Sequence, residues 1–452
     1  MKKILICLLF LSISLNNTLA LSKAENQKSY QAVLNQRIAS DVPGVAVIIT
    51  KSGQVLFKGA RGLANVELGI PLTTDHVFRL GSITKQFTAA AIMMLQEQNK
   101  LNINDDIHKY VPDFPTEGNK VTIENLLTHT SGIANYTEDG DLFQKEIQVP
   151  TDIDQMLTRF SKHPMPLKTG VAMRYSNTGY VILGKIIEVA SGQSYADFIE
   201  TQIFKKLGMK SSRYGGSQII PNRASGYDMS PNGVVNASYI DMMWPHAAGS
   251  LLSTVDDLDL WFKALRSGKL LTKESYQKMI QPFKLNDGSL SNYGYGLGIS
   301  KLNKYDAISH SGGIPGFSTN TIYIPSEDLY VAVLSNLSSR SSSLISRLLV
   351  AEALDIPVPK FIAVKPNLNK LKQLAGDYKI GKNSIRKFIV EDGKTFTQRD
   401  DGQKYEVTAM SENSFYYPSS LSYFVIESNQ KEQQVMKFYS LLGIEPQLAI
   451  KQ

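Results

Sequence analysis

The chain has 452 residues, of which 42% are hydrophobic and 20% are charged, and its formal net charge is +7. This length and apolar content allow a large core and favour two domains over a single small one. The basic residues are dispersed, without arginine-rich runs or interleaved aromatic residues, which argues against nucleic acid as a partner.

The first twenty residues have the layout of a secretory signal peptide. Lys2 and Lys3 precede an apolar run over residues 4–15, and a small-residue exit ends at Ala20. The run is shorter than the roughly 20 apolar residues that cross a bilayer, and no later segment reaches that length. Cleavage after Ala20 removes two lysines and no acidic residue, so the net charge falls from +7 to +5. We therefore predict a secreted protein, periplasmic or extracellular, without a transmembrane segment.

Cys7 is the only cysteine, and it lies inside the predicted signal peptide. The mature chain would then carry neither a thiol nor a disulfide, which excludes cysteine chemistry. As a lipid anchor, the alternative reading, Cys7 sits too early, before a full apolar region. The chain also lacks Cys-rich metal spacing, an H-E-x-x-H motif and a phosphate-binding Gly-Lys-Ser loop. We expect neither a metal nor a cofactor.

Strands and helices are mixed in the predicted first domain, residues 21–355. Residues 45–50 and 54–59, separated by a short Gly-containing turn, predict a β-hairpin. The pattern over residues 82–95 is helical and nearly apolar all round, which is typical of a helix buried at the centre of a domain. Further helices are predicted over residues 177–190, 195–207, 254–265 and 343–354.

Apolar runs separated by turns predict neighbouring strands of one antiparallel sheet at residues 293–299, 317–324 and 329–334. The proline-containing stretch 356–366 then predicts a linker. Beyond it, residues 367–452 show short alternating runs, which predict a small all-β domain.

Ser82-Ile83-Thr84-Lys85 is the first of four motifs that carry candidate chemistry. Residues three apart share one face of a helix, so the Ser82 hydroxyl and the Lys85 amine can approach each other. Burial would lower the pKa of Lys85 until its amine accepts a proton, and the helix N-terminus would stabilise a developing oxyanion. The alternative is a capped helix start with an exposed lysine, but the apolar run after Lys85 favours burial.

Tyr175-Ser176-Asn177 is the second motif, ahead of a predicted helix. Its phenol can relay a proton once an adjacent ammonium lowers the pKa, and its asparagine amide can both donate and accept. The alternative is that Ser176 or Asn177 simply caps the helix.

The third motif, His310-Ser311-Gly312-Gly313, precedes the strand predicted at residue 317. Its glycines permit close backbone approach to a ligand and leave an N–H free for an oxyanion. The alternative is a tight turn with an exposed histidine. The fourth motif runs from Leu126 to Gly132 in the order Leu-Leu-Thr-His-Thr-Ser-Gly, and we assign its His129 to structure rather than catalysis, because turn capping of this kind is common.

Together the four motifs resemble the serine β-lactamase and penicillin-binding protein superfamily, in the branch that holds class C β-lactamases, D,D-peptidases and esterases. The resemblance covers about residues 30–355. It implies an α+β fold, in which an antiparallel sheet is flanked by helices and a mostly helical insert lies between about residues 80 and 240. The active site would lie in the cleft between sheet and insert. The segment from Leu374 to Tyr378 looks like part of the small lipocalin-like domain appended to some of these hydrolases.

The resemblance also implies roles for single residues. Ser82 would be the nucleophile, Lys85 the group that activates it, and Tyr175 the donor of a proton to the leaving group. Asn177 would hold Lys85 and a substrate amide.

His310 would take the place of the cation in the third motif, and the N–H groups of Ser82 and Gly313 would form the oxyanion hole. Many β-lactamases carry lysine at the position of His310, whereas histidine occurs in the peptidase and esterase branches. An unperturbed histidine is mostly neutral at pH 7, so we expect substrates without a carboxylate to be tolerated.

Three functions are consistent with these motifs. The first is a peptidase or esterase that acts on D-amino-acid peptides, as a D,D-carboxypeptidase would, or on small esters. The second is a true class C-like β-lactamase, and the third is a catalytically weak penicillin-binding or scaffolding protein. The expected partner is therefore a small acyl or cell-wall-type substrate, and the sequence leaves the oligomeric state open.

Overall fold

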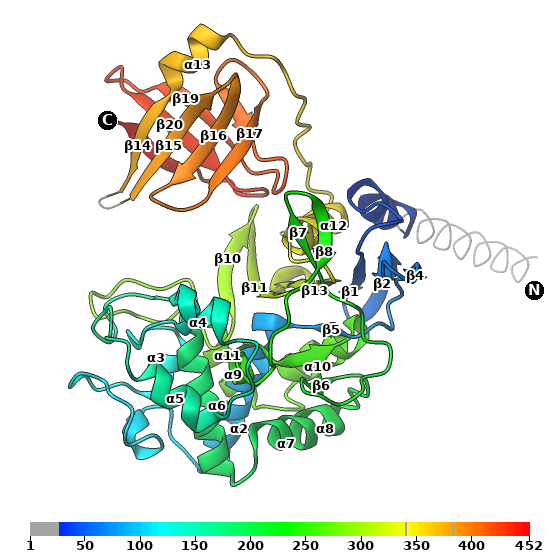
Figure 1. Ribbon diagram of the computed structural model, residues 1–452, viewed down its shortest axis with the longest axis vertical. Coiled ribbons are helices and arrows are strands. Elements are labelled where there is room, and N and C mark those ends of the chain that lie inside the picture. Colours follow the sequence, from blue (N-terminus) through cyan, green and yellow to red (C-terminus); the bar gives the residue numbers. More distant parts are fainter. Residues whose placement is uncertain (1–26, 340, 382–383) are drawn as a thin grey trace, which may run out of the picture. The chain divides into compact units, whose positions relative to one another are not determined.

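The computed structural model describes residues 27–339, 341–381 and 384–452 (Figure 1). The predicted signal peptide, with Cys7, lies outside the described residues. By its internal contacts the chain forms two compact units, one of Met1–Ser300 with Asp306–Ser346 and one of Lys301–Tyr305 with Arg347–Gln452. The stretch predicted as a linker, residues 356–366, contains neither helix nor strand.

A six-stranded sheet with the order β10-β11-β12-β13-β1-β2 forms the base of the first unit. The pairs from β11 to β2 are antiparallel, and the predicted hairpin of β1 and β2 is confirmed. Strands β1, β12 and β13 are buried along almost their whole length, which explains their continuous apolar runs. The strands are β1 (Val45–Lys51), β2 (Gln54–Arg61), β10 (Gly298–Leu302), β11 (Tyr305–Ile314), β12 (Phe317–Ile324) and β13 (Leu329–Ser335).

Shorter strands make three small sheets, β3 with β4, β5 with β9 and β6, and β7 with β8. They are β3 (Leu63–Asn65), β4 (Ile70–Pro71), β5 (Phe78–Arg79), β6 (Arg213–Tyr214), β7 (Tyr227–Ser230), β8 (Gly233–Asn236) and β9 (Leu251–Ser253).

Helix α2 lies at the centre of the first unit's core, as predicted. All its residues from 84 to 95 are buried, and it contacts both α6 and α9. Phe87 of α2 stacks on Trp261 of α10 with ring centroids 3.9 Å apart. Residues 27–37 are helical. The labelled α-helices from Thr84 to Ala353 are α2 (Thr84–Glu97), α3 (Ile123–Leu127), α4 (Gly140–Lys145), α5 (Ile153–Phe160), α6 (Asn177–Ser191), α7 (Tyr195–Ile199), α8 (Lys205–Leu207), α9 (His246–Gly249), α10 (Val255–Ser267), α11 (Lys273–Met279) and α12 (Ser341–Ala353).

The strand predicted over residues 293–299 is wrong. Most of this segment is irregular, because Gly296 has φ +68° and passes so close to α2 that a Cβ there would lie 2.5 Å from the Lys85 carbonyl oxygen. The edge strand of the sheet is instead β10, which begins at Gly298 and lies beside β11. The third motif, residues 310–313, lies inside β11 and not in a tight turn. An apolar run alone does not distinguish a buried strand from a buried loop.

The second unit contains a closed barrel of eight strands, drawn in orange to red in Figure 1, which confirms the predicted small all-β domain. Its core is apolar and includes Leu371 and Leu374 from the preceding helix α13 (Leu368–Leu374). The strands are β14 (Gly376–Ile380), β15 (Ser384–Glu391), β16 (Lys394–Arg399), β17 (Lys404–Ala409), β18 (Ser414–Tyr416), β19 (Tyr423–Ser428), β20 (Gln434–Tyr439) and β21 (Gln447–Lys451).

Candidate active site

Ser82 and Lys85 lie next to each other at the start of the central helix. Ser82 sits in a 3-10 turn, Gly81–Ile83, which runs directly into α2. The Lys85 Nζ donates a hydrogen bond to the Ser82 Oγ over 3.0 Å. Lys85 is wholly buried, whereas Ser82 is partly exposed. The serine is therefore accessible to a substrate and the amine behind it is shielded from water.

The other hydrogen-bond acceptors of Lys85 are uncharged. Its Nζ donates to the Asn177 Oδ1 over 2.8 Å and to the Ala248 carbonyl oxygen of α9 over 2.8 Å. Burial holds the pKa of Lys85 well below the usual 10.5. Neutral acceptors stabilise an ammonium less than a carboxylate would. This environment therefore favours the neutral amine, the form that accepts a proton.

Tyr175 borders the same amine, which lies 4.8 Å from the centre of its ring. The sequence suggested that an adjacent ammonium would lower the pKa of this phenol. Burial instead raises the pKa of Tyr175 above its usual 10, and a hydrogen bond with Ser82 only partly opposes the shift. Desolvation outweighs any nearby charge, so Tyr175 remains protonated and can serve as a donor.

Asn177 is held in one orientation by two residues that the sequence did not reveal. Its backbone N–H and its Nδ2 both donate to the Asn135 Oδ1, over 3.0 and 3.2 Å, and Nδ2 also lies 3.3 Å from the Thr137 Oγ1. The Asn177 Oδ1 therefore faces Lys85. Ser176 caps α6 by accepting from the Gly179 N–H, so this motif both starts a helix and lines the site.

His310 lies in β11 with an exposed fraction of 8%, and both its ring nitrogens are engaged within the protein. Its Nδ1 donates to the Ser311 carbonyl oxygen over 2.6 Å, so the Nε2 accepts from the Tyr293 hydroxyl at 2.7 Å. Burial lowers the pKa of His310 from 6.5 to about 3. The sequence analysis used the unperturbed pKa of histidine, but desolvation keeps the imidazole of His310 neutral far below pH 6.5.

The glycines of the third motif have different surroundings. A Cβ on Gly312 would lie 2.0 Å from the Leu80 carbonyl oxygen, so this glycine allows β11 to approach the protein's own backbone. Gly313 is exposed, and a Cβ there would meet open space. Gly81 has φ +54°, and a Cβ on it would lie 2.9 Å from the Gly313 nitrogen. The Gly313 backbone thus runs beside the turn that carries Ser82.

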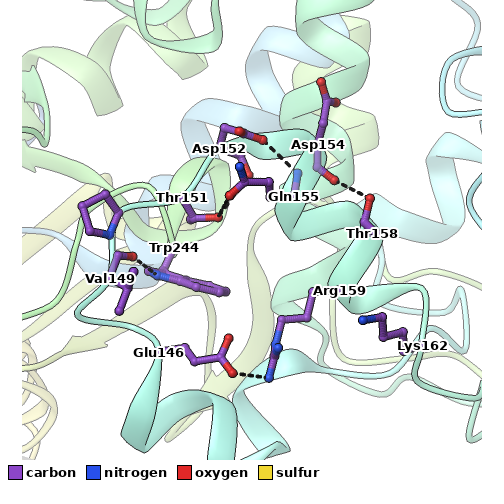
Figure 2. A pocket seen from close by; sticks show the side chains of 11 residues that line it. Glu146, Val149, Thr151, Asp152, Asp154, Gln155, Thr158, Arg159, Lys162 and Trp244 are labelled. Carbon is purple, nitrogen blue, oxygen red and sulfur yellow. Dashed lines mark hydrogen bonds and ion pairs between the residues drawn. The ribbon is translucent and has the colours of Figure 1, made fainter.

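A surface hollow of about 780 Å³ lies beside helix α5 (Figure 2). Its wall includes the Glu146–Arg159 ion pair at 2.5 Å and Trp244, whose indole donates to the Val149 carbonyl oxygen over 2.9 Å. The Trp244 carbonyl oxygen accepts from the Tyr136 hydroxyl over 3.0 Å. None of the predicted site residues lines this hollow. Trp244 instead connects its wall to the loop that carries Asn135.

Within the part of the chain that the structure describes, no three His, Cys, Asp or Glu side chains are grouped so that they could hold a metal ion. No helix in the described ranges is long and apolar enough to span a membrane.

The chain is similar to several known proteins. Penicillin-binding protein 4* of Bacillus subtilis is 31% identical over 365 residues, which cover 77% of this chain and 79% of that protein. The D-aminopeptidase of Gluconobacter oxydans is 27% identical over 319 residues, 70% of this chain but only 59% of that relative. The solved structure of an octameric penicillin-binding protein homologue from Pyrococcus abyssi has a TM-score of 0.66 at 27% identity and covers 95% of this chain and 99% of that one.

The family model described as Beta-lactamase matches residues 30–355. This range holds Ser82, Lys85, Tyr175 and Asn177, and it ends before the barrel begins. The chain therefore belongs to the beta-lactamase family, to which a closed eight-stranded barrel is added at the C-terminal end.

Proposed function

We propose that this protein is an exported serine hydrolase that forms an acyl-enzyme on Ser82 and cleaves peptides or amides of D-amino acids, or small esters. The observation that carries the proposal is the wholly buried Lys85, with its Nζ 3.0 Å from the Ser82 Oγ and otherwise only carbonyl-type acceptors. A buried amine without a charged partner costs free energy unless it is neutral, and a neutral amine beside a hydroxyl is a general base.

Each group has a proposed step in the reaction. In the neutral amine, two N–H groups satisfy the oxygens of Asn177 and Ala248, which leaves the lone pair directed at the Ser82 hydroxyl. Lys85 takes the serine proton while the Ser82 Oγ forms a bond to the substrate carbonyl carbon. The N–H groups of Ser82 and Gly313 stabilise the resulting oxyanion.

Collapse of this intermediate breaks the bond to the leaving group, which must gain a proton. The protonated phenol of Tyr175, hydrogen-bonded with Ser82, supplies it, and Lys85 returns its proton to Tyr175. Water then attacks the acyl carbon and gives a proton to Lys85, and the bond to the Ser82 Oγ breaks as Lys85 returns that proton to it and the acid product leaves. No metal or cofactor takes part in these steps.

The neutral His310 supports the proposed substrate class. Both its nitrogens are engaged by Tyr293 and Ser311, so the ring offers no positive charge to a substrate carboxylate. A site without that cation suits substrates that are uncharged at this end, such as amides and esters. The similarity to a D-aminopeptidase favours D-configured substrates.

Acylation by β-lactams is the second candidate function. It is favoured by the 31% identity to penicillin-binding protein 4*. The two functions share the acylation step and differ in how fast water releases the acyl group.

One purified preparation of the full-length protein decides between these functions. Turnover is measured with D- and L-alanine p-nitroanilide, p-nitrophenyl butyrate and a chromogenic cephalosporin, with Ser82→Ala as control. The proposal requires that the D-anilide or the ester is turned over and that a fluorophosphonate adduct forms on Ser82. Efficient turnover of the cephalosporin alone would favour the β-lactamase, and a stable adduct without turnover a penicillin-binding protein. An N-terminus that begins after Ala20 in protein recovered from outside the producing cell would support export.

A further inference from the structure

His129 has an unusual backbone conformation directly beside the proposed site. It follows α3, has φ +57°, and is only 1% exposed. A non-glycine residue in the left-handed region is strained, and such residues persist where the surrounding structure holds them firmly. The sequence assigned this histidine to turn capping. In the structure its side chain contacts the segment around Tyr175.

His129 binds the main chain on both sides of Tyr175. Its carbonyl oxygen accepts from the Arg174 N–H over 2.8 Å, and its Nδ1 accepts from the Ser176 N–H over 3.1 Å. Its imidazole also packs against the Tyr175 ring, with centroids 4.1 Å apart and planes inclined by 35°. One residue therefore holds the backbone before Tyr175, the ring of Tyr175 and the backbone after it.

The second nitrogen of the ring shows why a histidine is used here. Because the Nδ1 accepts, the proton lies on the Nε2, and this buried atom has no hydrogen-bond partner. The rings of Tyr180 and Tyr293 pack around the imidazole at 5.0 and 4.8 Å. A buried donor without a partner costs free energy, so an apolar ring would suit this pocket better if packing were the only requirement. The Nδ1 acceptor is the property that an apolar ring lacks.

The imidazole stays an acceptor at neutral pH. Burial is the largest of the causes that hold the pKa of His129 well below 6.5. Protonation would replace the Nδ1 lone pair by an N–H and so break the bond from Ser176.

We infer that His129 is a positioning residue that sets Tyr175 and Asn177 against Lys85, an inference that rests on the proposed Ser82 chemistry. Tyr175 reaches Ser82, and Asn177, two residues further on, accepts from Lys85. The positions of both side chains therefore depend on the segment, residues 174–176, that His129 holds. A displacement of about 1 Å in such a group costs up to about 100-fold in rate.

Two substitutions separate the acceptor from the ring. His129→Phe keeps an aromatic ring beside Tyr175 but removes the acceptor. His129→Asn removes the ring, but its Oδ1 stands the same number of bonds from the backbone as the Nδ1, and asparagine tolerates positive φ better than most residues. We expect His129→Phe to lower kcat by about 10- to 100-fold with KM changed less than about threefold, and His129→Asn to recover most of that loss.

The measurement is kcat and KM on p-nitrophenyl butyrate, with the thermal midpoint of each full-length variant from circular dichroism. Phe262→Leu is the matched control, because the rings that pack against Phe262 in the core, those of Tyr330 and Tyr323 at 4.5 and 4.7 Å, are not residues of the proposed site. It should lower the midpoint and leave kcat within about twofold.

Three outcomes would overturn the inference. They are a folded His129→Phe with the wild-type kcat, a His129→Asn as slow as His129→Phe, and a Phe262→Leu that loses kcat in proportion to its midpoint. If His129→Phe does not fold, His129→Gly replaces it, since glycine relieves the left-handed backbone and also lacks the acceptor. A wild-type protein that forms no fluorophosphonate adduct on Ser82 would instead refute the proposed function, and the two failures are thus distinguishable.

Discussion

The first unit and the barrel each bury a basic side chain among uncharged partners. Lys85 is wholly buried and donates to Ser82, Asn177 and Ala248. Arg386, 8% exposed, lies in the barrel with its guanidinium 4.1 Å from the centre of the Phe438 ring. Burial lowers the pKa of both groups.

The two environments lead to different chemistry because the side chains differ. A lysine can lose its proton when it is desolvated, whereas an arginine keeps its charge in a protein. Arg386 is accommodated by stacking and by long hydrogen bonds to Tyr417 and Gln447, at 3.4 and 3.3 Å. Burial of a cation therefore does not make an active site. A proton that can leave, and a hydroxyl within reach, are also needed.

The largest expected effect comes from the hydroxyl itself. Ser82→Ala should reduce turnover by more than about 10⁴-fold, because no covalent intermediate can form. The measurement is mass spectrometry of the fluorophosphonate adduct together with turnover of p-nitrophenyl butyrate. Labelling that persists in the variant would place the nucleophile elsewhere.

The second prediction tests whether the side chain at position 85 must be able to lose its proton. Lys85→Ala should slow acylation by about 10²- to 10⁴-fold, the usual range for a general base. Lys85→Arg places a permanent cation there that cannot be deprotonated, and should be similarly slow. Both are measured as single-turnover acylation rates, with circular dichroism to verify folding. An arginine variant with wild-type rates would remove proton transfer from the role of this residue.

The orientation of Asn177 should matter less. Asn135→Ala removes the oxygen that accepts from both the backbone N–H and the Nδ2 of Asn177. We expect kcat to fall by about tenfold, since the amide can then rotate away from Lys85. Asn135→Asp restores an acceptor and should be faster than the alanine variant. Equal rates for the wild type and Asn135→Ala would show that Asn177 needs no such support.

The pH profile should be insensitive to His310. Because its pKa in the folded protein is about 3, the ring is neutral from pH 5.5 to 7.5, and His310→Asn should leave the shape of kcat/KM in this range unchanged. The folded pKa lies below the unfolded value of about 6.5, so the unfolded state binds more protons between pH 3 and 6.5. The wild type should therefore lose unfolding free energy, relative to His310→Asn, as the pH falls through that window. Denaturant titrations at pH 4 and 7 measure this difference, and an equal loss of unfolding free energy in both proteins would contradict it. An inflection in kcat/KM near pH 6.5 that disappears in the variant would contradict the expected pH profile.

The smallest effect is expected from the barrel. No motif in residues 367–452 supplies a nucleophile or a base, so deleting them should leave acylation of small esters within about threefold. If the truncated chain does not fold, Arg386→Met provides the same comparison within the full-length protein. Loss of small-ester acylation in a folded variant of either kind would show that the barrel contributes to the chemistry.

Local sequence patterns predicted most of the helices and strands. In the site they predicted the motif residues but not the residues that contact them. The buried helix α2 follows from its apolar run, and the cap at Ser176 from residue type. The motif around His310 shows where such reasoning fails, because the glycines and apolar residues were compatible with a turn as well as with strand β11. The partner strand, β12, begins at Phe317, directly after β11 ends at Ile314, so the pairing itself is local. Glycines are depleted in strands, which is why the motif was not predicted to lie in one.

The sequence by itself determined the family, the sheet-and-helix fold, the β-domain at the end of the chain and the pairing of Ser82 with Lys85, since these depend on spacing within one element or on motif order. Only the tertiary structure decided the surroundings of that pair. Asn135 and Ala248 are brought to the site by elements that do not adjoin it in the chain, and nothing in their local sequence marks them. The protonation states of Tyr175 and His310 were likewise decided by folding, because desolvation depends on how much of the protein closes over each group.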